Sequence, residues 1–148
     1  MRVLLQRVLE ARVEVDDETV GRIGRGFLLF VGMGKGDTEA EWTWMARKIA
    51  GLRVFEDEAG KMNLPLSAVE GACLVVSQFT LYGDCRKGFR PGFTDAAPPE
   101  IAREGVARFA RALRDLDVPV ETGTFQAHMR VSLVNDGPVT LMLEREPG

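Results

Sequence analysis

The chain has 148 residues and a net charge of −3, and 45% of its residues are hydrophobic and 28% charged. This composition excludes a disordered chain, and no apolar run approaches the roughly 18 residues that a membrane-spanning helix needs. We expect residues 1–148 to form one cytoplasmic domain, because Gln6 and Arg7 come too early for the apolar region of a signal peptide. The chain has only two cysteines and one histidine, and their spacing matches no metal-ligand pattern. We therefore expect no disulfide framework, no metal site and no cofactor.

The N-terminal segment alternates apolar and polar residues, as a long strand does. The residues expected to share its apolar face are Val3, Leu5, Leu9, Ala11, Val13 and Val15. Arg7 falls on the same face, where a guanidinium is costly unless it finds hydrogen-bond acceptors. We therefore expect Arg7 to be hydrogen-bonded in the interior or at an interface. The alternative is an edge position or a side chain whose charged end reaches water.

The remaining elements predict a mixed α/β domain that is rich in strands and has two main helices packed on the sheet. Thr38 and Glu41 fit a capping box that opens the first helix, and Pro98 and Pro99 open a second that reaches Leu116. Strands are expected over residues 3–15, 19–23, 27–33, 72–80, 118–120, 129–134 and 139–144.

The strand that begins at Ala72 has an unusual polar end. Five apolar residues in a row suit a strand covered on both faces, and they are followed by Ser77, Gln78, Phe79 and Thr80. Backbone N–H groups around the last three of these residues could form an oxyanion hole for a carbonyl oxygen. The attacking group would then be water or a hydroxyl of the substrate, which suits an activated ester better than an amide. The alternative is that Ser77 and Thr80 merely cap the strand end.

A serine or threonine nucleophile needs a base, and the sequence offers little for that role. His128 is the only imidazole. In the expected strand it alternates with Met129, so it should face solvent or an interface rather than complete a catalytic triad.

A long loop follows the polar strand end. Glycines and a proline exclude regular structure over most of residues 81–93, and a loop of this length inside a compact domain is usually functional or disordered. Lys87 and Arg90 flank Phe89 there, together with Arg86. We favour a functional role for this basic and aromatic cluster over solvated charge.

Two motifs resemble the signature motifs of the D-aminoacyl-tRNA deacylase family, also called D-tyrosyl-tRNA(Tyr) deacylases. They are Val76-Ser77-Gln78-Phe79-Thr80-Leu81 and Asn135-Asp136-Gly137-Pro138-Val139-Thr140. The start of the chain (residues 3–8), the loop at residues 87–93 and residues 123–129 match as well, so the resemblance covers nearly the whole chain. One departure is Gln126, where the family pattern has glycine, and we expect it to alter how that segment approaches the pocket.

The resemblance implies a homodimer that proofreads chirality in translation quality control. Gly137 and Pro138 of one subunit, joined by a cis bond, would enter the pocket that residues 77–80 form in the other. Their carbonyls would hold the α-ammonium of the aminoacyl group and leave no room for an L side chain. Arg7 would fix this motif. Without the resemblance, a tight hairpin turn is the simpler interpretation of Gly137 and Pro138.

The resemblance also implies a hydrolase that binds tRNA and does not bind DNA or membranes. Phe89, Lys87 and Arg90 would contact the 3′-terminal adenosine, and Met129 would wall the pocket. Thr80 is one candidate nucleophile, but without a base we favour the 2′-hydroxyl of the tRNA or a water that it positions. A pocket that excludes L side chains without requiring a D side chain should also admit glycine, so glycyl-tRNA is an expected second substrate.

Three other interpretations remain open from the sequence. The first is a sister editing enzyme with a trans Gly137–Pro138 bond that removes small L-amino acids, although Phe79 favours the D-specific branch. The second is an RNA-binding module without catalysis. The third is a purely structural dimer, which explains neither Arg7 nor the basic loop.

Overall fold

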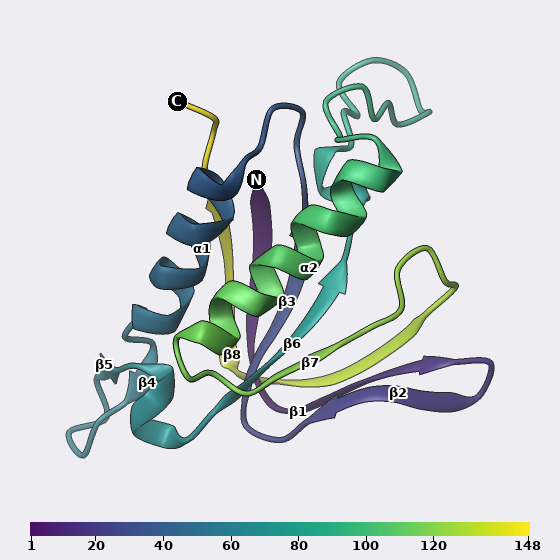
Figure 1. Cartoon of the computed structure of the whole chain (residues 1–148). Coiled ribbons are helices and arrows are strands. Elements are labelled where there is room, and N and C mark those ends of the chain that lie inside the picture. The colour runs from purple at the N-terminus through teal and green to yellow at the C-terminus, as the bar shows by residue number, and fades with distance from the viewer.

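The computed structural model describes residues 1–148, and its centre is a six-stranded sheet built around one long strand (Figure 1). The strands of the sheet are β1 (Arg2–Val15), β2 (Glu18–Ile23), β3 (Gly26–Gly32), β6 (Ala72–Ser77), β7 (Val120–Thr122) and β8 (Arg130–Glu144). Their order is β2-β1-β3-β6-β7, and β8 pairs with β1. The pairs of β1 with β2, β3 and β8 are antiparallel, whereas β3–β6 and β6–β7 are parallel.

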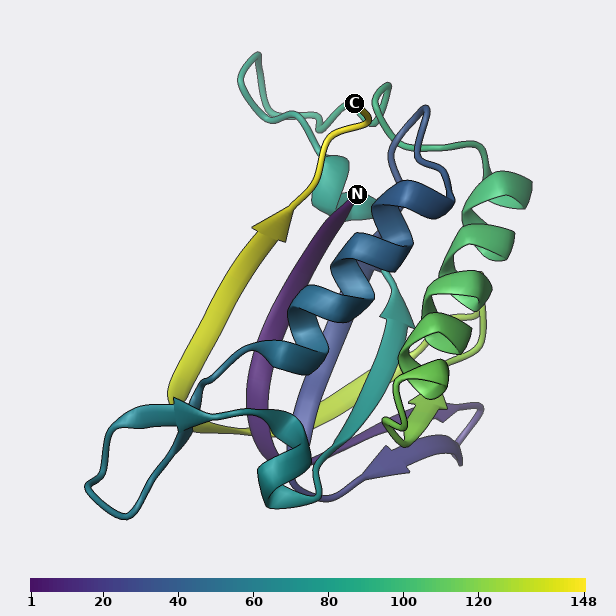
Figure 2. The ribbon, with the colours of Figure 1, turned by 60° about the vertical axis from the view of Figure 1, so that its left-hand side comes forward.

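The helices α1 (Glu39–Gly51) and α2 (Pro99–Asp115) lie on the same side of the sheet (Figure 2). The main core is a cluster of 22 buried residues that includes Met45 and Ile49 of α1 and Phe109 of α2. A smaller cluster of 7 buried residues includes Val8, Leu28 and Leu74. The predicted mixed α/β fold is therefore confirmed, and both helices begin where the capping box and the proline pair predicted.

The alternation predicted for β1 is wrong at Leu9, which is 53% exposed, whereas its neighbour Val8 is fully buried. The register with β8 shifts on both sides of Val8, between Gln6 and Val8 and again before Glu10. This irregularity shifts the alternation, because side chains otherwise alternate with a strict period of two. Val3 and Leu5 pack in the main core before it, whereas Val8 packs in the smaller cluster. Buried positions resume at Ala11 and Val13, in the smaller cluster.

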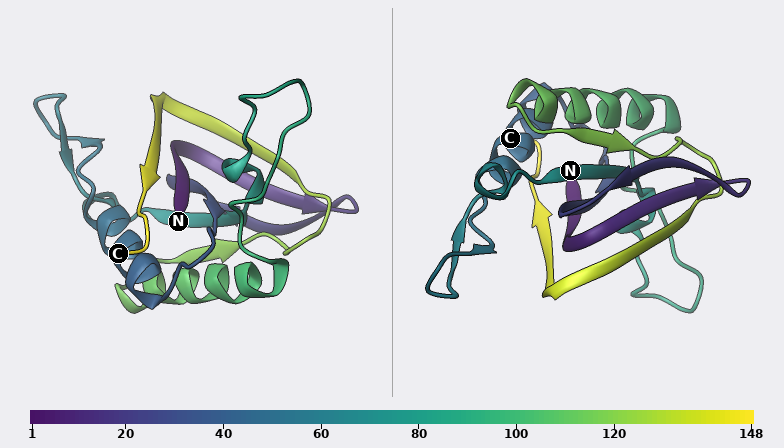
Figure 3. Two further views of the ribbon diagram at one scale, coloured as in Figure 1. Left: turned by 90° about the horizontal axis from the view of Figure 1, so that it is seen from above. Right: turned by 90° about the horizontal axis from the view of Figure 1, so that it is seen from below.

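The two strands predicted over 129–134 and 139–144 are one strand, β8, which bends sharply (Figure 3). Gln6 pairs with Thr140 and Val8 pairs with Asn135, so residues 136–139 lie opposite Arg7 alone. The bend therefore falls at the second sequence motif. A further correction concerns the strand predicted to reach Thr80. It ends at Ser77, and a 3-10 helix, η2 (Phe79–Tyr82), follows.

The remaining elements are a small hairpin and a second 3-10 helix, namely β4 (Phe55–Glu56), β5 (Met62–Leu64) and η1 (Leu66–Val69). Two isolated bridges, Gly34 with Ala96 and Asp84 with Gly92, interrupt the otherwise irregular segment between η2 and α2. None of the helices in the structure is both long enough and apolar enough to cross a membrane.

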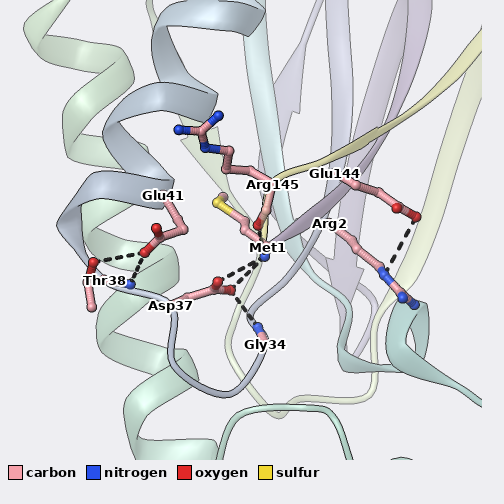
Figure 4. Close-up of polar contacts among 8 residues, drawn as sticks. All are labelled: Met1, Arg2, Gly34, Asp37, Thr38, Glu41, Glu144 and Arg145. Atoms are coloured by element: carbon pink, nitrogen blue, oxygen red, sulfur yellow. Dashed lines mark hydrogen bonds and ion pairs between the residues drawn. The ribbon is translucent and has the colours of Figure 1, made fainter. Parts of the chain in front are cut away.

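A buried ion pair fixes the loop between β3 and α1 (Figure 4). The α-ammonium of Met1 lies 2.8 Å from Oδ2 of Asp37 and donates to the carbonyl of Arg145 at 2.7 Å. The same Asp37 oxygen accepts a 2.7 Å hydrogen bond from the N–H of Gly34. The α-ammonium of Met1 thus connects this loop, through Asp37, to Arg145 just after β8.

Candidate active site

A cavity of about 1010 Å3 opens where β6 ends. Its wall is formed by the ends of β3 and β6, the start of η2, residues 93–99 at the entry to α2, and residues 125–131. Four of the residues singled out in the sequence, Ser77, Gln78, Phe79 and Met129, line this cavity together. The loop fixed by Asp37 contributes Met33 and Lys35 to the same wall. The polar end of β6 therefore meets a space large enough for a small-molecule group.

Of the three backbone N–H groups expected to form an oxyanion hole, those of Gln78, Phe79 and Thr80, only two are free. The N–H of Gln78 is not available, because it donates to the carbonyl of Val31 at 2.8 Å and continues the sheet. The N–H groups of Phe79 and Thr80 begin η2 and donate to no protein acceptor, as is usual in the first turn of a helix. Two consecutive free amides next to the cavity remain as donors for an oxyanion.

No side chain in the cavity wall is arranged to activate a hydroxyl. The hydroxyl of Thr80 accepts a hydrogen bond from Nε2 of Gln78, but Thr80 is exposed and does not line the cavity. His128 is exposed, as predicted, yet it lies in the loop before β8 rather than in the predicted strand, and this loop brings it to the cavity wall. Neither Ser77 nor Thr80 is hydrogen-bonded to His128 or to a carboxylate, so there is no catalytic triad.

Arg7 is 4% exposed, so the prediction of a buried, hydrogen-bonded guanidinium is confirmed, and the alternative of a side chain reaching water is wrong. Its Nε donates to the carbonyl of Asp136 at 3.1 Å and lies 3.5 Å from the Asp136 carboxylate, while Nη1 donates to the carbonyl of Val54. Asn135 completes the turn by donating from Nδ2 to the carbonyls of Arg7 and Val139, both at 3.0 Å.

Gly137 and Pro138 lie at the exposed corner that Arg7 holds, and the bond between them is cis, as expected. Gly137 has a φ of +124°, and a Cβ atom there would lie 2.6 Å from Nη2 of Arg7. Only glycine fits this position without strain. Neither residue lines the cavity of its own chain. One chain therefore carries the two sequence motifs at separate places.

The basic loop also lies apart from the cavity wall. Lys87, Phe89 and Arg90 are exposed, with Phe89 at 107%, and none of them lines the cavity. Arg86 donates to both carboxylate oxygens of Asp84 at 2.9 Å, and this lowers the pKa of Asp84 to about 2. The residue of this loop that does reach the cavity is Phe93, whose ring meets that of Phe79 edge-on at 5.1 Å between centroids.

Sequence reasoning also missed Phe93, Phe125 and Lys35 as cavity residues. Phe93 lies close to the predicted cluster, but the residue spacing does not indicate which aromatic side chain of the loop turns inward. Gln126, which replaces an expected glycine, also lines the cavity and has a left-handed φ of +62°. That conformation explains why glycine suits the position.

Comparisons with solved structures define the class of fold. A structure described as a probable eukaryotic D-amino acid tRNA deacylase superposes with a TM-score of 0.80 at 20% identity, over 96% of this chain and 97% of that one, which shows the shared fold. The structure of the c-Myc DNA Unwinding Element Binding Protein superposes with a TM-score of 0.92 at 40% identity, over 99% of both chains.

The sequence comparisons then show the family. The family model for D-Tyr-tRNA(Tyr) deacylase matches residues 4–144. The D-aminoacyl-tRNA deacylase of Thermotoga petrophila is 58% identical over 97% of both chains. That of Thermomicrobium roseum is 62% identical over 97% of this chain and 94% of the relative. The chain belongs to the D-Tyr-tRNA(Tyr) deacylase family, which is a family of hydrolases.

Proposed function

We propose that the protein hydrolyses the ester bond between a D-amino acid and the 3′ end of tRNA, releasing the free amino acid and tRNA in the cytoplasm. The observation that carries this proposal is the pair of free amides of Phe79 and Thr80 beside a cavity that has no nucleophile–base pair. Such a site stabilises a developing oxyanion but provides no strong base, which suits an ester. Membership of the family makes the aminoacyl-tRNA ester the substrate to test.

In this mechanism the ester carbonyl oxygen accepts hydrogen bonds from the two amides. Water, positioned by the 2′-hydroxyl of the terminal ribose, adds to the carbonyl carbon. If the 2′-hydroxyl itself adds first, the acyl group moves to the 2′-oxygen, and a water must then hydrolyse that 2′-ester to release the amino acid. For attack by water, the tetrahedral intermediate then collapses, the bond to the ribose 3′-oxygen breaks, and that oxygen takes the proton that the water loses. Thr80 is the weaker candidate nucleophile, because its hydroxyl lies outside the cavity wall and has no base.

Chiral selection would operate across a homodimer. Gly137 and Pro138 are exposed, are held rigidly through Arg7, and lie away from the cavity of their own chain. Inserted into the cavity of a second copy, their carbonyls would hold the substrate α-ammonium and leave no room for an L side chain. Met129 would form part of the opposing wall. Because glycine has no side chain to exclude, glycyl-tRNA would also be hydrolysed. Lys87, Phe89 and Arg90 would contact the tRNA 3′ end from their exposed loop.

The first test mixes the purified protein separately with D-tyrosyl-, L-tyrosyl- and glycyl-tRNA and follows release of the amino acid. Loss of D-tyrosine and glycine with L-tyrosine retained is the expected result. A protein that binds tRNA but releases no amino acid would be an RNA-binding module instead. Release of small L-amino acids but not D-tyrosine would favour the sister editing activity.

The cross-subunit arrangement has its own test. Ser77→Trp fills the cavity and leaves the motif intact, whereas Gly137→Ala disrupts the motif and leaves the cavity intact. In a heterodimer of the two variants, the Gly137→Ala subunit supplies an intact cavity and the Ser77→Trp subunit supplies an intact motif. If the site forms across the interface, these two intact parts face each other. We expect mixed dimers to recover D-specific hydrolysis that neither homodimer shows. No recovery in a heterodimer of verified composition would place both motifs in one chain's site.

A further inference from the structure

A second hollow of about 800 Å3 adjoins the cavity at the start of α2. Its lining is Pro98, Pro99, Glu100, Ile101, Arg103 and Gln126. Pro98, Pro99 and Gln126 also line the cavity, so the two spaces share a wall. A molecule that fills the cavity and extends outward past Gln126 enters this hollow.

Arg103 provides an unneutralised positive charge in the hollow. Its guanidinium lies 4.9 Å from the centroid of the Phe125 ring, and Nη2 donates to Oε1 of Gln126 at 3.4 Å. The nearby carboxylate of Glu104 is paired with Arg108 instead, at 3.3 Å. An arginine stacked on an aromatic ring keeps its remaining N–H donors in a fixed plane, which suits a phosphate.

Gln126 connects this arginine to the cavity. It adopts a φ of +62°, a conformation that is unfavourable for a residue with a side chain, and its carboxamide reaches the guanidinium of Arg103. The hydrogen bond and the Phe125 ring together restrict Arg103 to the side of the hollow next to the cavity. A glycine at position 126 would leave the arginine without this acceptor.

We propose that the hollow binds the nucleotide that precedes the aminoacylated 3′-terminal adenosine. Arg103 would contact the phosphate between the two nucleosides, and Gln126 would act as a positioning residue for Arg103. Ile101, which is 55% exposed, and the two prolines offer an apolar surface to the base. Glu100 also lines the hollow, so a phosphate is favoured only on the side of Arg103 and Gln126. This inference rests on the proposed function.

The test compares two small substrates, 3′-O-D-tyrosyl adenosine and the D-tyrosyl ester of the dinucleotide CpA. The second adds one phosphate and one cytidine. We expect the wild-type protein to prefer the CpA ester by about 5-fold in kcat/KM, a typical effect of one exposed ionic contact. Arg103→Gln should reduce this preference to about 1-fold while hydrolysing tyrosyl adenosine at the wild-type rate. Gln126→Gly should lower the preference for the CpA ester only in part. If Gln126 had a purely structural role, its replacement would affect both substrates alike and leave this preference unchanged.

Arg111→Gln is the matched control, because it removes the same charge from the same helix at a residue that lines neither space. It should retain the full preference. The inference is overturned if Arg103→Gln and Arg111→Gln have equal effects, if Arg103→Gln impairs both substrates alike, or if the wild type shows no preference. Failure of the proposed function is a different result, because the wild type would then release no amino acid from either ester or from D-tyrosyl-tRNA.

Discussion

The guanidinium of Arg7 donates from Nε to the main-chain carbonyl of Asp136 at 3.1 Å, across 129 residues of sequence. The same side chain holds the carbonyl of Val54 through Nη1. One buried charge therefore links three segments, the middle of β1, the bend of β8 and the chain after α1. The bend carries the exposed Gly137 and Pro138, so their position depends on Arg7.

Replacing Arg7 with methionine should destabilise the fold. The buried carbonyl of Val54 and the partly buried carbonyl of Asp136 would lose their donor, and we expect the free energy of unfolding to fall by about 2–4 kcal/mol. Urea unfolding measures this change. Arg12→Met is the matched control on the same strand, because Arg12 is solvent-exposed and pairs only with Glu14. Equal losses in the two variants would contradict the role assigned to Arg7.

Gly137→Ala should be strongly unfavourable at the same bend. The added Cβ would lie 2.6 Å from Nη2 of Arg7, and φ would stay near +124°. We expect a loss of about 2 kcal/mol or more in unfolding free energy, together with weaker rejection of L-tyrosyl-tRNA. Gly24→Ala is the control, since a Cβ there meets nothing within 4 Å. A Gly137→Ala protein as stable and as selective as the wild type would show that the bend tolerates a side chain.

Asp37→Asn tests the ion pair that holds the cavity loop. It would leave the buried α-ammonium of Met1 without a carboxylate, and we expect a loss of about 3 kcal/mol. Because Asp37 also accepts from Gly34, next to cavity residues Met33 and Lys35, hydrogen exchange in residues 33–37 should become faster. Asp84→Asn changes an exposed ion pair in another loop and should leave both measurements unchanged.

Tyr82 should resist deprotonation. Burial, followed by the nearby charge of Asp37, raises the pKa of Tyr82 well above its ordinary value near 10. The unfolded chain loses this proton first. The stability linked to protonated Tyr82 is therefore complete below about pH 10 and is lost as the pH rises towards the raised pKa. Tyr82 is the single tyrosine, so phenolate absorbance reports it directly. A reversible phenolate transition near pH 10 in the folded protein would contradict its burial.

Tyr82→Phe gives a separate result. The Tyr82 hydroxyl is buried and has no hydrogen-bond partner among the protein atoms. Removing it should leave the free energy of unfolding unchanged or raise it by about 1 kcal/mol, because no hydrogen bond is lost and one buried polar group is removed. Thermal unfolding of the two proteins checks this. A large loss of stability would mean that the hydroxyl makes a contact with water that is important for the fold.

Much of the fold could be predicted because its signals are local. The capping box at Thr38 and Glu41 and the prolines before α2 act within one helical turn, and both helices begin there. The polar end of β6 was likewise recognisable as the wall of a site. The exposed Leu9 was not predictable from β1 alone, because the register with β8 decides which residues of β1 face inward.

The candidate site likewise has some features that local sequence signals predict and others that depend on long-range contacts. From the sequence one can conclude that Arg7 needs acceptors and that residues 77–80 end a buried strand in polar groups, since burial and hydrogen bonding restrict these residue types wherever they lie. The folded chain, in contrast, is needed to identify Asp136 and Val54 as the acceptors. It is also needed to see that the N–H of Gln78 donates to Val31 while those of Phe79 and Thr80 are free, and that Phe93 reaches the cavity. These contacts join segments far apart in the chain, so they depend on strand pairing and packing that no local pattern specifies.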